Sequence, residues 1–126
     1  KERGYKYHPY NKKKNLKIGK INFTHGKYVP KYHAYKHLDH YGENIMYGHT
    51  HDLQRFTKTF NGGTISSWSL GCLKDIEADE DWLGGKLTNW NHAFAIIDFF
   101  KGGNFKVEVV EIIKGVTTVW GNLIKG

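Results

Sequence analysis

The sequence predicts an α/β fold of the α+β kind, with about seven strands and one main helix. A strand, helix, strand order over residues 21–47 supports this class. Two later pairs of β-rich runs support it too, because glycine-containing turns of the hairpin kind join each pair. With 126 residues, 39% of them apolar, the chain is long enough for a hydrophobic core of one domain.

The first half of the chain contains the strand, helix, strand unit. Residues Leu16–Phe23 alternate loosely between polar and apolar and are predicted as a strand, interrupted near Gly19. The next elements are a helix over His33–Tyr41, which Gly42 ends, and a buried strand over Glu43–Tyr47. Such a unit implies parallel strands joined by a right-handed crossover, so the carboxyl ends of both strands meet at one edge of the sheet.

The predicted helix carries histidines on one face. His33, His37 and His40 are spaced i, i+4, i+7, and a pair at i, i+4 can chelate a metal ion. No carboxylate-rich motif accompanies them. We therefore expect these histidines to be partly exposed, or to support a site from behind its ligands.

The second half of the chain is predicted to be mostly strands. Asn61, Gly62 and Gly63 form the first hairpin signal, and the residues between Phe100 and Phe105 form the second. The acidic run Asp75–Asp81 matches no calcium loop in its spacing and is expected to be a solvated loop. The predicted strands cover Gln54–Phe60, Thr64–Leu70, Ala93–Phe100, Phe105–Ile113 and Val116–Trp120.

The net charge of +7 comes entirely from residues 1–20. We therefore divide the chain into a basic N-terminal segment, residues 1–20, and a domain over residues 21–126. Those first 20 residues hold eight Lys or Arg and one acidic residue, whereas the remainder is balanced. Tyr5, Tyr7 and Tyr10 alternate with the basic residues, a mixture that suits phosphate contact and base stacking on single-stranded nucleic acid. The alternative is a solvated surface segment.

The composition also bears on the compartment. No apolar run approaches the roughly 18 residues of a membrane span, and no signal peptide opens the sequence. Cys72 has no second cysteine with which to form an internal disulfide, so nothing in the sequence indicates secretion. We expect a cytoplasmic protein without membrane contact.

Three histidines lie at the ends of the two parallel strands. His25 follows the first strand, and His49 and His51 follow the second after Gly48. If the backbone stays extended, the side chains at i and i+2 leave the same face, so His49 and His51 point into one site. Neutral imidazole suits Zn, Fe, Mn and Ni alike. The arrangement predicts a metal site formed by His25, His49 and His51.

These motifs resemble signature blocks of the calcineurin-like metallophosphoesterases. Thr24–Gly26 is similar to the fourth block of that family and Gly48–His51 to the fifth. The resemblance covers most of residues 18–126, and the segments Ser69–Leu73 and Ala93–Asp98 are similar to phage and prophage members. It implies the C-terminal half of a four-layer α/β/β/α sandwich.

The resemblance implies phosphoester hydrolysis at a pair of divalent metal ions, Mn being favoured over Fe, Zn or Ni. His25 and His49 would bind one metal and His51 the other, with a bridging hydroxide as the nucleophile. Arg55 and Lys27 are candidates for binding the nonbridging phosphate oxygens. Asp52 departs from the basic or neutral residue of many relatives, which leaves a substrate contact there in doubt.

The first three blocks of that family, which supply carboxylates, an asparagine and the general-acid histidine, do not occur in this sequence. We therefore expect a C-terminal piece that needs the N-terminal half of the domain as its partner. Alone it would bind at most one metal ion, would not turn over a phosphoester and would be prone to self-association. Two alternatives remain: a nucleic-acid-binding module using residues 1–20, and a noncatalytic remnant.

Overall fold

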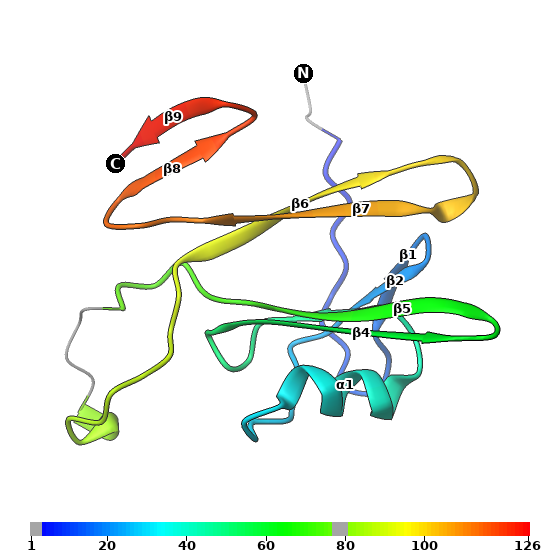
Figure 1. The fold of residues 1–126 in the computed structure, drawn as a ribbon, viewed down its shortest axis with the longest axis horizontal. Helices are drawn as coiled ribbons and strands as arrows, with labels where there is room; N and C mark the ends of the chain where they lie inside the picture. Colours follow the sequence, from blue (N-terminus) through cyan, green and yellow to red (C-terminus); the bar gives the residue numbers. More distant parts are fainter. Residues whose placement is uncertain (1–3, 77–80) are drawn as a thin grey trace.

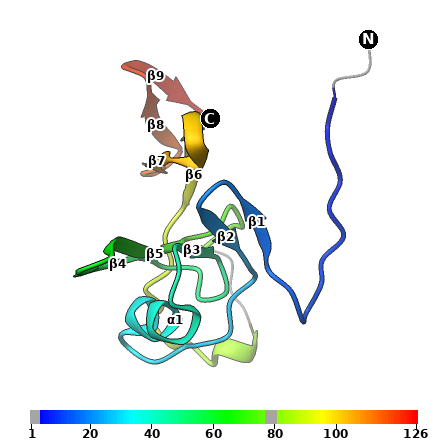
Figure 2. The same ribbon diagram turned by 90° about the vertical axis from the view of Figure 1, so that its right-hand side faces the viewer.

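The computed structural model describes residues 4–76 and 81–126, which form a mixed α+β structure built on a five-stranded sheet. The strand order in this sheet is β1-β2-β3-β5-β4. Helix α1 covers one face, and the β6–β7 hairpin lies on the other side with the β8–β9 hairpin beyond it (Figures 1 and 2). No helix among the described residues is long and apolar enough to cross a membrane.

The elements have the following bounds. The main sheet and its helix comprise β1 (Leu16–Ile18), β2 (Ile21–Phe23), α1 (His33–Tyr41), β3 (Ile45–Tyr47), β4 (Leu53–Phe60) and β5 (Gly63–Leu70). The remainder comprises η1 (Asp81–Leu83), β6 (Ala93–Phe99), η2 (Lys101–Gly103), β7 (Phe105–Glu111), β8 (Val116–Val119) and β9 (Asn122–Lys125).

The predicted crossover unit is confirmed. β2 and β3 are parallel, with Asn22 opposite Ile45, and α1 connects them. The helix begins at His33 and ends at Tyr41, as the sequence predicts, because Gly42 adopts φ +63° and donates its backbone N–H to the Leu38 carbonyl. β5 adds a third parallel neighbour on the far side of β3.

Two predictions about the strands need correction. β1 and β2 are separate strands of an antiparallel hairpin, with Leu16 opposite Phe23 and Gly19 at φ +55° in the turn. The described residues contain nine strands and not about seven, partly because β9 was missed. The turn before β9 places Trp120 at φ +49°, which few non-glycine residues adopt, so the sequence carries little turn signal there. Part of the predicted acidic loop, residues 77–80, lies outside the described residues.

The core lies on both faces of the main sheet. Ile21, Met46 and Trp68 pack together on the face toward the β6–β7 hairpin, which contributes partly buried side chains such as Ile97 and Val107. On the opposite face, the α1 residues Ala34 and Leu38 are each only 2% exposed. Burial on both faces explains why the short strand β3 is apolar throughout, as is typical of a central parallel strand.

Candidate metal centre

The ends of β2 and β3 bring two of the predicted ligands into direct contact. Nε2 of His25 lies 2.9 Å from Nδ1 of His49, and the two rings meet edge to face with centroids 4.8 Å apart. The backbone N–H of Gly48 donates to the His25 carbonyl at 3.2 Å, which extends the parallel pairing past the strand ends. The contact predicted from the crossover is therefore present.

Gly26 makes this close approach possible. Its φ is +100°, and a Cβ added there would lie 2.8 Å from the Tyr47 ring and 3.0 Å from the Cβ of His49. The first separation is shorter than Cβ contacts in proteins and the second is tighter than most of them, and the positive φ disfavours other residues. The loop after β2 can thus pass against the end of β3 only with glycine at this position.

The backbone at His51 is not the extended one on which the sequence prediction relied. Residues 48–51 form a turn in which the His51 N–H donates to the Gly48 carbonyl at 3.4 Å, and His51 has φ +60°. The backbone is therefore not extended, and His49 and His51 do not leave one face of a strand. The His51 ring packs edge to face on Trp90, with centroids 4.9 Å apart.

The pKa of His49 is lowered. Burial is the largest cause, and the neighbouring imidazoles of His25, His51 and His33 lower it further, since each would repel a second positive charge. His49 is therefore neutral at pH 7 and offers a ring nitrogen lone pair. Metal ions bind that neutral form of histidine.

His33, on the first turn of α1, holds both ends of the segment that carries His49 and His51. Its Nδ1 lies 2.5 Å from the Tyr47 hydroxyl and its Nε2 lies 3.0 Å from Oδ2 of Asp52. Because a carboxylate only accepts, Nε2 carries the proton and donates it to Asp52. The remaining ring nitrogen then accepts from the Tyr47 hydroxyl, which keeps its proton because burial raises its pKa.

His37 holds the other loop, the one that follows His25. Its Nδ1 donates to the His33 carbonyl at 2.7 Å, and its Nε2 accepts the backbone N–H of Lys27 at 3.0 Å. The ring also stacks on Tyr47, with centroids 3.7 Å apart. Burial lowers the pKa of His37 to about 4, so both hydrogen bonds are those of the neutral ring.

Of the two alternatives expected for the helical histidines, partial exposure applies to His40 and not to His33 or His37. His33 is 3% exposed and His37 is completely buried, whereas His40 lies at the surface. The sequence gives their i, i+4 spacing but does not show that Tyr47 and the loops following β2 and β3 provide partners for them. These two residues support the site from behind, as the other part of that expectation states.

The two cations proposed as substrate contacts have other neighbours. The Lys27 ammonium lies 2.8 Å from Nε2 of His40, on the surface of α1. The Arg55 guanidinium, on the edge strand β4, lies 5.3 Å from the centre of the Trp68 ring. Neither makes a hydrogen bond to His25 or His49 within the described part of the chain.

The His25 and His49 nitrogens have a spacing that suits a shared metal ion. Two nitrogens bound to one ion at about 2.0–2.1 Å lie about 2.9 Å apart at a right angle and about 3.3 Å apart in a tetrahedral site. The observed 2.9 Å separation equals the right-angle value, and it is also the length of a hydrogen bond in which one ring donates its N–H and the other accepts. Within residues 4–76 and 81–126, however, no group of three or more His, Cys, Asp or Glu side chains is arranged to hold a metal ion. The donor pair fits part of a metal site and lacks its anionic ligands.

No protein family matches the sequence, and comparisons with curated proteins and with solved structures find no match either. The chemistry of the site therefore rests on its own geometry. That geometry consists of the His25–His49 imidazole pair at the carboxyl edge of a sheet, supported from behind by the buried residues His33 and His37.

Proposed function

We propose that this chain supplies the histidine ligands of a metal-dependent phosphoesterase. His25 and His49 would hold one divalent ion and His51 would bind a second. The observation that carries the proposal is the 2.9 Å approach of Nε2 of His25 to Nδ1 of His49 across a parallel strand pair. The resemblance of both loops to metallophosphoesterase blocks supports the same assignment, with the four-layer sandwich as the parent fold.

The bound ions would supply an activated hydroxide and stabilise charge on the phosphate oxygens. The contribution of this chain is the fixed orientation of its imidazoles, together with the lowered pKa of His49. His33 fixes the loop bearing His49 and His51, and His37 fixes the loop bearing His25. Such support behind metal ligands typically changes metal affinity by about 10- to 100-fold.

The charge of the site implies a missing contributor. Two divalent cations beside neutral imidazoles need anionic ligands to compensate their charge. Asp52, the acidic side chain adjoining His51, is hydrogen-bonded to His33. We therefore propose that the carboxylate ligands come from outside residues 4–76 and 81–126, and that the described residues alone bind at most one ion and do not hydrolyse a phosphoester.

The test uses the protein as its gene encodes it, with bis(p-nitrophenyl) phosphate as substrate and Mn²⁺ added. We expect hydrolysis that falls at least 100-fold in His25→Ala and in His49→Ala. His8→Ala is the matched control, because His8 is an exposed histidine outside the sheet, and it should leave the rate unchanged. A His49→Ala variant that hydrolyses the ester at the native rate would overturn the proposal.

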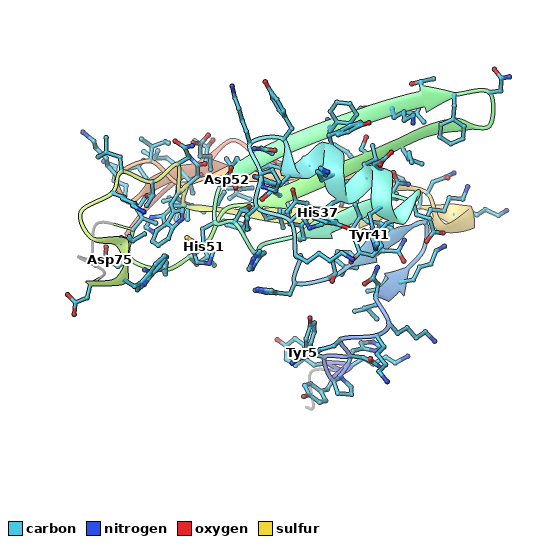
Figure 3. The ribbon with its side chains drawn as sticks, turned by 90° about the horizontal axis from the view of Figure 1, so that it is seen from below. Tyr5, His37, Tyr41, His51, Asp52 and Asp75 are labelled. Carbon is cyan, nitrogen blue, oxygen red and sulfur yellow. The ribbon has the colours of Figure 1, made fainter. Side chains whose placement is uncertain are left out.

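A second candidate function is binding of single-stranded nucleic acid by residues 4–15. Tyr5 and Tyr7 are 84% and 85% exposed, and this segment contains no strand or helix. Figures 2 and 3 show it leading away from the sheet. Exposed rings between lysines combine a stacking surface with phosphate contacts.

A salt titration tests this candidate separately from hydrolysis. The chain with and without residues 1–14, which precede β1, would be titrated with an oligothymidylate at several salt concentrations. A steep decrease in affinity with salt that is lost on deletion supports nucleic-acid binding by this segment. Equal affinity and equal slope in both proteins exclude it.

A further inference from the structure

A groove of about 1000 Å³ lies beside the turn that carries His51. Its walls come from three separate parts of the chain: the start of α1, strand β4 and the loop that precedes β6. Asp52 lines one end of it, and Figure 3 shows Asp52 and His51 near each other at this end of the sheet. The volume is at the upper end of the range of about 300–1000 Å³ that ligand sites occupy.

Trp90 joins this groove to the candidate metal centre. The indole forms part of the groove wall, and it also packs on the His51 ring with centroids 4.9 Å apart. The Asn91 N–H donates to the His51 carbonyl at 2.9 Å, so the loop is attached to the histidine turn by its backbone too. A phosphoester bound at His51 would therefore lie next to Trp90, at the wall of the groove.

The walls are aromatic and accessible. Tyr32 is 66% exposed, Tyr35 43% and Phe56 37%, although all three line a concave surface. Tyr35 and Phe56 meet edge to face with centroids 5.1 Å apart, and Trp90, which lines the same groove, also packs against the Lys74 ammonium and the Trp82 ring. Flat, accessible rings around a groove favour a planar ligand that stacks.

The polar groups select a ligand with hydrogen-bonding edges and negative charge. The Asn89 side chain lines the groove and makes no hydrogen bond within the described residues, so its amide is free to donate and accept. The Lys31 ammonium lies 5.3 Å from the centre of the Tyr32 ring and has no carboxylate partner among them. The carboxylate of Asp52 is already engaged by His33.

We propose that this groove binds the nucleoside of a nucleotide phosphoester, with the base stacked on Trp90 and Tyr35 and hydrogen-bonded by Asn89. Lys31 would contact the next phosphate of the strand. This assignment rests on the proposed phosphoesterase function and specifies its substrate class. An aryl or alkyl ester without a base fits the aromatic walls less well, because it lacks both the wide ring face and the hydrogen-bonding edge.

The proposal is tested by binding, which does not require hydrolysis. The ¹⁵N-labelled chain would be titrated with thymidine 5′-monophosphate and, separately, with ribose 5-phosphate, following the indole N–H of Trp90 by NMR. We expect the nucleotide to bind about tenfold more tightly, since each stacked base contributes about that much. Trp90→Leu and Tyr35→Leu should each abolish this preference, and Trp120→Leu, in the turn between β8 and β9, should preserve it.

Either of two results would overturn the groove assignment: equal affinity for the two phosphates, or a preference that survives in both groove variants. Tyr35→Leu keeps the proposal testable if Trp90→Leu disturbs His51, because Tyr35 lies on α1 and does not contact that ring. Base-selective binding together with a His49-independent esterase would retain the groove and reject the proposed metal centre. A His49-dependent esterase that binds without base selectivity would support the proposed metal centre and reject the groove assignment.

Discussion

Nε2 of His33 lies 3.0 Å from the Asp52 carboxylate, and this contact ties the first turn of α1 to the residue that follows the histidine turn. The same ring accepts a hydrogen bond from Tyr47, which precedes the turn. One buried side chain therefore holds both ends of a six-residue segment. The candidate ligands His49 and His51 lie between those two fixed points.

Replacing His33 by leucine should destabilise the protein by about 3 kcal/mol, because it leaves a mostly buried carboxylate without its principal partner. The Asp52 side chain is only 16% exposed, so water compensates little of the loss. The free energy of unfolding from urea titration measures the effect. His40→Leu, at an exposed position of the same helix, should change it by less than about 0.5 kcal/mol.

Adding Asp52→Asn to His33→Leu should recover part of that loss, since the neutral amide costs less to bury than the unpaired carboxylate. The two substitutions should therefore cost less together than the sum of the single changes. Strictly additive values would show that the two side chains do not interact energetically.

Stability should fall in acid because His37 is buried in its neutral form. The folded-state pKa of His37 is about 4 and the unfolded value is 6.5, so only the unfolded chain binds the proton between these pH values. The stabilisation from neutral His37 is fully present above pH 6.5. It is lost as the pH falls toward 4, and the total loss in the free energy of unfolding is about 3 kcal/mol. Urea unfolding at pH 7 and pH 4.5 should show a smaller difference for His37→Gln than for the native chain. An unchanged difference would contradict the assignment of this loss to His37.

Gly26→Ala should cost more than Gly42→Ala, although both glycines have positive φ. The Gly42 position has open space around it, so the substitution there incurs only the backbone penalty, about 1 kcal/mol. At Gly26 the added methyl also meets the Tyr47 ring and His49. We expect a total cost of about 2–4 kcal/mol, comparable to overpacking in a core. Equal unfolding free energies for the two variants would mean that the loop after β2 moves aside freely.

His51→Gly should be more stable than His51→Ala by about 1 kcal/mol, since both remove the imidazole and only alanine resists φ +60°. The opposite order is expected at His40 within α1, where glycine costs about 1 kcal/mol relative to alanine. Thermal unfolding of the four variants measures both differences. The same order at the two positions would rule out a left-handed backbone at His51.

The sequence predicted the features that depend on local chemistry. The helix boundaries follow from apolar spacing and from the left-handed glycine Gly42, and the contact of His25 with His49 follows from the parallel crossover. The starts of β3, β4 and β5 and the ends of β6, β7 and β8 differ from prediction by one or two residues, because strand ends depend on pairing partners.

The features that were missed depend on residues far apart in the chain. The burial of His33 arises from Tyr47 and Asp52, 14 and 19 positions away. The turn at His51 depends on the loop that carries Trp90, and no periodicity in that loop indicates where it lies. No sequence pattern predicts the groove either, since its three walls come from separate segments of the chain.

A single nine-residue helix anchors both loops, through His33 to one and His37 to the other. If α1 shifts as a rigid body, the loops bearing His25 and His49 move with it in the same direction, and the distance between the nitrogens of these two rings is preserved. Substitutions elsewhere in the sheet can then accumulate without separating the two rings. The distance between the His25 and His49 rings therefore tolerates such substitutions, because the same helix holds both loops.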